Sequence, residues 1–187
     1  PFVAVLLAGT GAAGTVVRID GSGFNGATRI DFGTLPSTSF KVVNSMQAEA
    51  TVPAGVQTDI LKLTTTNGVA VSTTPFYGTP RVDSFSPTTG RPGTQVLVTG
   101  INLKGATGLT LAGLAITGFE VVDNKQIRFE VPAGASSGTV RVTTPGGSAT
   151  SETTFVVRGP EPTLTSLSPS EGGPGTTVTL LGSNLAA

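Results

Sequence analysis

The chain has 187 residues, with 11 basic and 11 acidic side chains, so its formal net charge is zero. A neutral chain in which only 12% of residues are charged has little to attract phosphates, which argues against nucleic acid as a partner. The chain contains no cysteine and no histidine, which excludes disulfides, thiolate zinc sites and Ser-His or Cys-His catalysis.

The first apolar run, residues 2–13, admits two interpretations. An apolar stretch that ends in small residues is typical of the end of a signal peptide. However, the run has no basic residues before it and is in register with two later strand openings, which favours a first β-strand. No run of about 18 apolar residues follows anywhere, so no membrane span is expected.

The sequence then repeats itself. Residues 1–79 align without a gap to residues 80–158, with 28 of 79 positions identical, and a third copy opens at Pro162. A fixed period of this kind is the signature of a tandem array. We therefore expect a first unit at 1–79, a second unit at 80–158, and the first strands of an incomplete third unit at 162–187.

Within each unit, apolar residues alternate with polar ones, as in strands with one buried face. Val96 and Val98 flank Leu97, which is therefore expected to point outward, and Ile127 and Phe129 flank Arg128. Glycine-rich turns separate about seven such runs per unit, and no helical period is sustained. The predicted fold class is all-β, with tandem antiparallel β-sandwiches. The other predicted core positions are Val17, Ile19, Phe40, Val42, Leu61, Leu63, Phe76, Phe119, Val121, Val131, Val140, Val142 and Phe155.

Two short proline-containing segments join the units. They are Gly78-Thr79-Pro80 and Arg158-Gly159-Pro160-Glu161-Pro162. Proline stiffens a linker and cannot pair within a central strand. We therefore single out these eight residues as inter-domain joints and expect an extended rod.

The third unit supplies only two strands, whose apolar side chains need a cover. Two strands alone are marginally stable in water. We expect the chain to be a piece of a longer array whose third unit continues, with exchange of this segment for residues 1–24 of another copy as the alternative. The side chains in question are Leu164, Leu167, Val178 and Leu180.

The motifs of the second unit resemble those of the IPT/TIG domain, an immunoglobulin-like domain. They are the opening P-x-V-x-S-F-S-P-x-x-G-x-P-G-T, the sequence V-P-A-G, the run V-R-V-T-T-P-G-G and the closing T-x-F-V-V. The third unit matches through Leu185, and the first unit departs at residues 5–8, so its first strand is expected to sit differently. The resemblance implies tandem immunoglobulin-like sandwiches of a bacterial surface or extracellular protein.

Candidate chemical sites are few. Single aspartates that are scattered along the chain do not form a calcium loop, and Glu120 and Glu130, on outward faces, do not make a convincing glycosidase pair. Glycan binding usually needs aromatic platforms, and Tyr77 is the single tyrosine in a chain without tryptophan. We therefore expect no catalytic, cofactor-binding or metal-binding residues and no enzyme activity. The aspartates are Asp20, Asp31, Asp59, Asp83 and Asp123.

These observations favour a structural spacer in a multi-domain extracellular stalk, fibre or adhesin, with units stacked end to end. The expected partners are neighbouring units of the same or a longer chain. A homo-polymer is a further possibility, because the mean hydropathy of +0.23 indicates a rather apolar surface. The alternative is a ligand-binding or glycan-binding accessory module of a larger surface receptor or carbohydrate-active enzyme.

Overall fold

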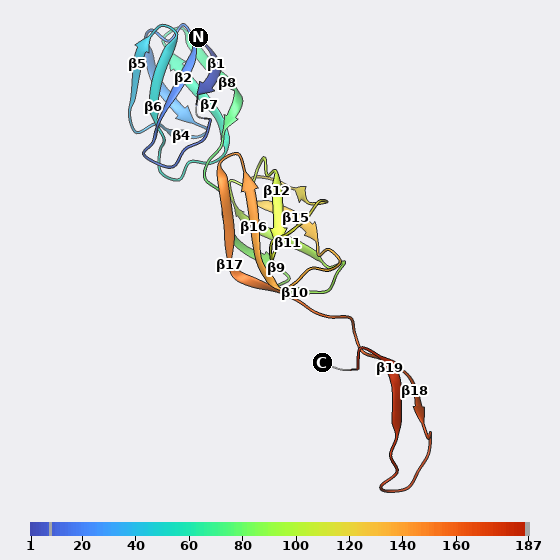
Figure 1. Ribbon diagram of the computed structural model, residues 1–187. Coiled ribbons are helices and arrows are strands. Elements are labelled where there is room, and N and C mark those ends of the chain that lie inside the picture. The colour runs from blue at the N-terminus through green and yellow to red at the C-terminus, as the bar shows by residue number, and fades with distance from the viewer. Residues whose placement is uncertain (8, 186–187) are drawn as a thin grey trace.

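A computed structural model describes residues 1–7 and 9–185 (Figure 1). Ala8, in the divergent start of the first unit, and residues 186–187, the end of the predicted third unit, lie outside the described residues. All regular elements of the described part are strands, which confirms the all-β prediction. In that part no helix is long and apolar enough to cross a membrane.

The first unit contains eight strands, β1 to β8. They join into a single sheet in the order β4-β3-β7-β8-β1-β2-β6-β5, because β1 pairs antiparallel with β2 and parallel with β8. The first strand therefore links the two layers of this unit. The bounds are β1 Phe2–Leu7, β2 Val16–Ser22, β3 Ala27–Phe32, β4 Leu35–Pro36, β5 Phe40–Asn44, β6 Gln47–Thr51, β7 Asp59–Thr65 and β8 Gly68–Phe76.

The second unit contains nine strands in two separate sheets. One sheet has the order β10-β17-β16-β12-β13 and the other β14-β15-β11-β9, which makes a two-layer sandwich. Here the first strand is divided between the layers: β9 pairs with β11, and β10 pairs with β17. The bounds are β9 Arg81–Ser86, β10 Thr89–Gly90, β11 Gln95–Ile101, β12 Gly108–Leu111, β13 Leu114–Ala115, β14 Glu120–Val121, β15 Gln126–Glu130, β16 Gly138–Thr144 and β17 Gly147–Val157.

Each of the two units has its own hydrophobic core. The alternation predicted from the internal copies is confirmed, because the predicted core positions of these units are buried, except Phe40, Val42, Phe119 and Val121, which are half-buried against the two cores. In the first unit Phe32 and Phe76 pack edge to face with ring centroids 4.9 Å apart, and in the second unit Phe85 packs against Phe155 at 5.9 Å. Such aromatic pairs add to the burial of apolar area that stabilises each sandwich.

Leu97 lies on the face of β11 opposite to the core. It pairs across the sheet with Ser86 of β9 and Arg128 of β15, and its side chain is half-buried, whereas Val98 is fully buried. The predicted register is therefore confirmed, but neighbouring strands partly cover a side chain that we expected to be exposed.

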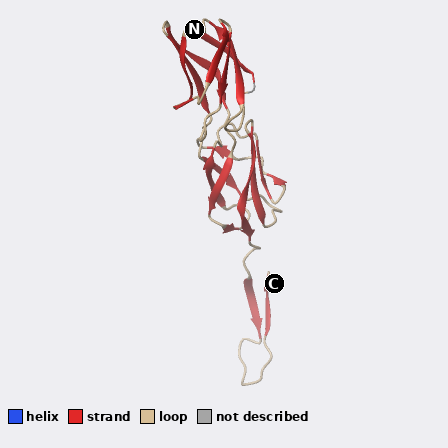
Figure 2. Ribbon diagram, turned by 90° about the vertical axis from the view of Figure 1, so that its left-hand side faces the viewer, coloured by secondary structure: helices blue, strands red, loops and turns tan. Residues whose placement is uncertain are grey.

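The third unit contributes one antiparallel hairpin, β18 (Thr163–Ser168) and β19 (Thr179–Ser183). Its apolar side chains are 45–57% exposed, because the described residues contain no strands to cover them. The three units follow one another along a single direction, end to end (Figures 1 and 2).

Candidate functional site: the joints between the units

Several of the scattered acidic residues pair with neighbouring polar or basic side chains. Glu120 lies 3.3 Å from Arg128, and Glu130 accepts a hydrogen bond from Gln95 at 3.1 Å. Within the part that the structure describes, no group of three or more acidic, histidine or cysteine side chains is placed to bind a metal ion.

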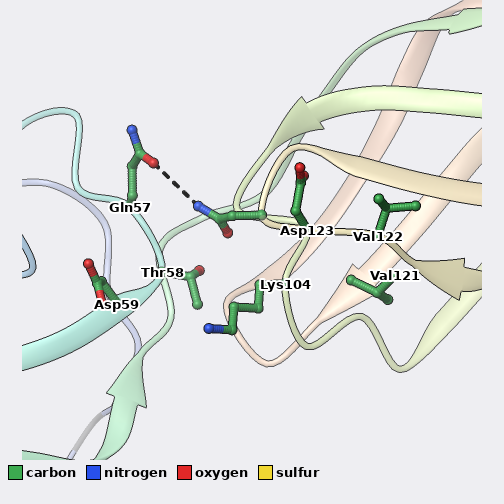
Figure 3. A pocket seen from close by; sticks show the side chains of 8 residues that line it. Gln57, Thr58, Asp59, Lys104, Val121, Val122 and Asp123 are labelled. Atoms are coloured by element: carbon green, nitrogen blue, oxygen red, sulfur yellow. Dashed lines mark hydrogen bonds between the residues drawn. The ribbon is translucent and has the colours of Figure 1, made fainter.

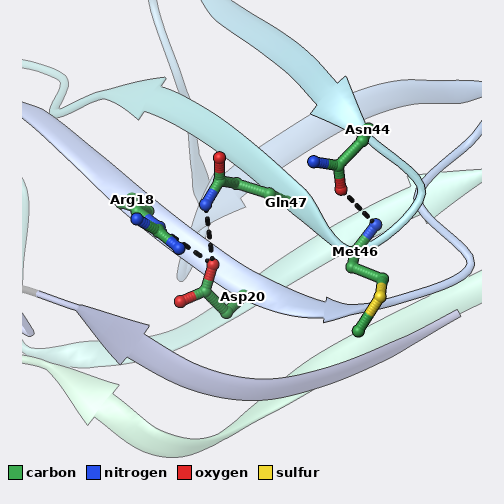
Figure 4. Close-up of polar contacts among 5 residues, drawn as sticks. All are labelled: Arg18, Asp20, Asn44, Met46 and Gln47. Carbon is green, nitrogen blue, oxygen red and sulfur yellow. Dashed lines mark hydrogen bonds and ion pairs between the residues drawn. The ribbon is translucent and has the colours of Figure 1, made fainter.

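Asp20 shows this local pairing most fully (Figure 4). Its carboxylate accepts hydrogen bonds from Gln47 at 3.2 Å and from Arg18 at 3.0 Å, and these two bonds lower the pKa of Asp20. Nearby, Asn44 accepts a hydrogen bond from the backbone of Met46 and closes the turn between β5 and β6. These contacts connect β2 with β6 and fix the turn between β5 and β6 at the surface.

The most specific polar arrangement lies at the first joint, between the first and second units. Asn102, which follows β11, reaches across the boundary with both ends of its amide. Its Oδ1 accepts from the backbone N–H of Thr58 at 2.7 Å, and its Nδ2 donates to the carbonyls of Val56 at 3.1 Å and Thr79 at 2.9 Å. We call this set of three bonds the Asn102 bridge. It ties a loop of the first unit, the joint itself and a turn of the second unit to one side chain.

Burial strengthens the Asn102 bridge. Asn102 is 2% exposed and Thr58 is 5% exposed, so water does not compete for these bonds. Thr58 makes a second connection, because its Oγ1 accepts from the backbone N–H of Gly78 at 3.2 Å. Breaking the bridge would leave buried donors and acceptors without partners, which costs about 1–3 kcal/mol for each group.

Glycines allow the two units to approach closely. A Cβ at Gly146 would lie 2.1 Å from the carbonyl oxygen of Gly78, and a Cβ at Gly105 would lie 2.8 Å from the ring of Tyr77. Tyr77, the single tyrosine, is therefore half-buried against the second unit instead of forming an exposed platform. In the predicted first joint, Gly78 and Pro80 are buried and Thr79 is exposed.

Beside the bridge is a cleft of about 510 Å³ (Figure 3). Asn124 donates to Oε1 of Gln57 across it at a long 3.4 Å, and the buried Oδ1 of Asn124 has no partner among the described residues. No aromatic ring lines this cleft, so it offers no flat surface on which a sugar ring would stack. The lining residues are Gln57, Thr58 and Asp59 of the first unit and Lys104, Val121, Val122, Asp123 and Asn124 of the second.

The second joint is more exposed to solvent than the first. All five of its predicted residues, Arg158 to Pro162, are exposed. Counted from equivalent positions in the repeat, this joint is three residues longer than the first, since 82 residues separate Pro80 from Pro162 and 79 separate Pro1 from Pro80. Proline content alone therefore does not decide how tightly two units pack.

Sequence reasoning missed Asn102. Its backbone φ is +57°, a left-handed conformation that asparagine tolerates better than most residues do. The internal copies contain the signal: the equivalent residues are Gly23, with φ +71°, and Asn184, with φ +55°. A position occupied only by glycine and asparagine indicates a left-handed turn, but it does not indicate that the asparagine side chain reaches another unit.

Comparison with known proteins agrees with this architecture. The family model of the IPT/TIG domain matches residues 80–157, which is nearly the whole second unit. The second unit is similar to the IPT/TIG domain. The resemblance predicted from its motifs is thus confirmed for the second unit, and no match was found among curated proteins.

Several solved structures are similar to this chain. A protein crystallised with a xylogluco-oligosaccharide matches 98% of this chain over 47% of its own length, with 22% identity and a TM-score of 0.51. SGBP-B from a xyloglucan utilization locus of Bacteroides uniformis matches 83% of the chain over 50% of its length, with 21% identity and a TM-score of 0.42. A surface glycan-binding protein of Prevotella bryantii matches 80% of the chain at 16% identity and a TM-score of 0.44. The chain spans about half the length of the first two of these proteins.

Proposed function

We propose that this chain is a non-catalytic spacer segment of a larger glycan-binding protein on the bacterial cell surface. In this proposal its IPT/TIG domain and the flanking units keep a separate glycan-binding domain at a distance from the cell envelope. The observation that carries the spacer role is the Asn102 bridge, because buried hydrogen bonds across a domain boundary are what a rod needs and a flexible tether lacks.

The glycan-binding part of the proposal is supported by the structure that was solved with a xylogluco-oligosaccharide. Nearly all of this chain is similar to about half of that protein, which leaves the other half of such a protein for the binding site. Polysaccharides of this kind are too large to cross a membrane, so a protein that binds them works outside the cell. This reasoning motivates the proposed surface location.

The segment itself is poorly suited to bind a sugar chain. Among the side chains that the structure describes, the aromatic rings are buried or half-buried, and none forms an exposed platform. Phe40 and Phe119 pack against the two cores, and Tyr77 packs against Gly105. We therefore assign glycan binding to a part of the larger protein outside this segment.

Two binding measurements test the proposal. Isothermal titration calorimetry of residues 1–187 with xyloglucan oligosaccharides should give no measurable heat of binding. An antiserum against this chain should detect a native polypeptide much larger than 18.6 kDa, and immobilised plant glucans should retain that polypeptide. Tight binding by residues 1–187 would contradict the spacer role. A native polypeptide that no glucan retains would contradict the glycan-binding assignment.

Self-association is a second candidate function, favoured by one surface of the first unit. Ile60 of β7 and Val69 and Val71 of β8 are exposed on the outer face of their sheet, where the second unit has Thr139, Ser148 and Thr150. Exposed apolar groups on one face are typical of an interaction surface.

Sedimentation velocity tests this candidate. If the face associates, the wild-type chain should form concentration-dependent oligomers, and replacing the three residues by their second-unit counterparts should abolish them. A wild-type chain that stays monomeric at millimolar concentration would exclude association through this surface.

A further inference from the structure

The second joint contains two features that the first joint lacks, and they contact each other. One is the three-residue insertion, Gly159-Pro160-Glu161, and the other is Arg91. The residues equivalent to Arg91 are Ala12 in the first unit and Gly173 in the third. Arg91 donates from Nε to the carbonyl of Gly159 at 2.9 Å, and its Nη1 lies 2.8 Å from Oε1 of Glu161.

Glu161 is bound from both sides. Its carboxylate pairs with Arg91 of the second unit, while its backbone carbonyl accepts a hydrogen bond from Nδ2 of Asn184 in the third unit at 3.1 Å. The bond from Asn184 repeats the bond from Asn102 to Thr79, because Asn184 is equivalent to Asn102 and each acceptor is the residue directly before the proline that opens the next unit.

Among the described residues, the second joint has no counterpart of the direct contact that completes the first joint. In the first joint the asparagine also reaches Val56 and Thr58 of the preceding unit. The equivalent loop in the second unit is residues 135–137, where Ser137 accepts from the backbone of Val157 as Thr58 does from Gly78. Asn184 nevertheless remains exposed, and its side chain bonds to the insertion and not to this loop.

We propose that the contacts of Glu161 with Arg91 and Asn184, which we call the Glu161 contacts, set the direction of the third unit relative to the second. Where the first joint has the buried Asn102 bridge, the second joint has an exposed ion pair, in which the side chains of Arg91 and Glu161 are 42% and 70% exposed. Salt screens the attraction between exposed charges but has little effect on buried hydrogen bonds. The second joint is therefore a hinge whose stiffness depends on ionic strength, and the first joint is not. This inference goes beyond the proposed function and stands whether or not the larger protein binds a glycan.

The test is the exchange rate of the Arg91 Nε–H proton, measured by NMR on residues 1–187. Glu161→Gln keeps the backbone carbonyl and the side-chain size but removes the charge. We expect this variant to exchange the proton roughly twofold to fivefold faster, the range of effects for exposed ion pairs. Raising the salt concentration from about 0.02 M to about 0.5 M, which shortens the Debye length from ~20 Å to ~4 Å, should have a similar effect on the wild type.

The matched control is Glu171→Gln, which removes the charge of an exposed glutamate with no ion pair among the described residues. It should leave the Arg91 proton unchanged, and the amides of Gly78 and Thr79 should be insensitive to salt. In the double variant Arg91→Glu, Glu161→Arg, which keeps an opposite-charge pair, the backbone amides of residues 159 and 161 should be as well ordered as in the wild type. An Arg91 proton that responds equally to both glutamine variants, or to neither, would overturn the proposal.

Discussion

Phe129→Ala is expected to destabilise the second unit by about 3–5 kcal/mol, the usual cost of a large-to-small change in a packed core. Phe129 is 1% exposed and pairs with Val96 across β15 and β11, in the middle of the second core. The loss is a large part of the stability of a small domain. It should appear as a lower urea midpoint for the amide signals of the second unit.

Leu97→Thr is the matched control on an adjacent strand. Because Leu97 is half-buried and lies on the face away from the core, its replacement should cost about 1 kcal/mol or less. Threonine also suits a strand, so the backbone gains no strain. Similar losses in the two variants would contradict the register and the position of the core.

Asn102→Ala is expected to uncouple the first and second units. The substitution removes all three bonds of the Asn102 bridge and leaves the N–H of Thr58 and the carbonyl of Val56 buried without partners. We expect a loss of about 2–4 kcal/mol in the free energy that couples the units. The two units should then unfold independently in urea and tumble independently in ¹⁵N relaxation.

Two further variants separate the causes of this effect. Asn102→Gly removes the same side chain but accepts φ +57° without strain, as Gly23 does at +71°, so it should be about 1 kcal/mol less destabilising than Asn102→Ala. Asn124→Ala removes only the long 3.4 Å bond to Gln57 and should leave the units coupled. Coupling that survives in both Asn102 variants would show that close packing at Gly105 and Gly146 suffices without the bridge.

The core could be predicted from the sequence because its signal is local and repeated. Val17, Val96 and Val178 occupy the same place in three copies, with variable residues beside them, which identifies the inward face without any structure. The exposure of Val178 follows from the same rule, because the described residues contain no opposing sheet for its hairpin.

The positions of the joints could be predicted from the sequence, but the contacts that hold them could not. The Asn102 bridge connects residues 44 and 46 positions apart, and no periodic pattern marks such a pair. The three-residue insertion is visible in the alignment of the copies, but its consequence depends on where the Arg91 side chain points. Proline content predicted two stiff joints, whereas in the structure Gly78 and Pro80 of the first joint are buried and the second joint is exposed throughout.

Residual dipolar couplings of the backbone amides test the central claim most directly, because they report the relative orientation of the units in solution. If the Asn102 bridge makes the first two units one rigid body, a single alignment tensor should fit the couplings of residues 9–157, with the orientation of the structure. Two tensors of different magnitude for residues 9–77 and 81–157 would mean that the units move independently and would contradict a rigid spacer.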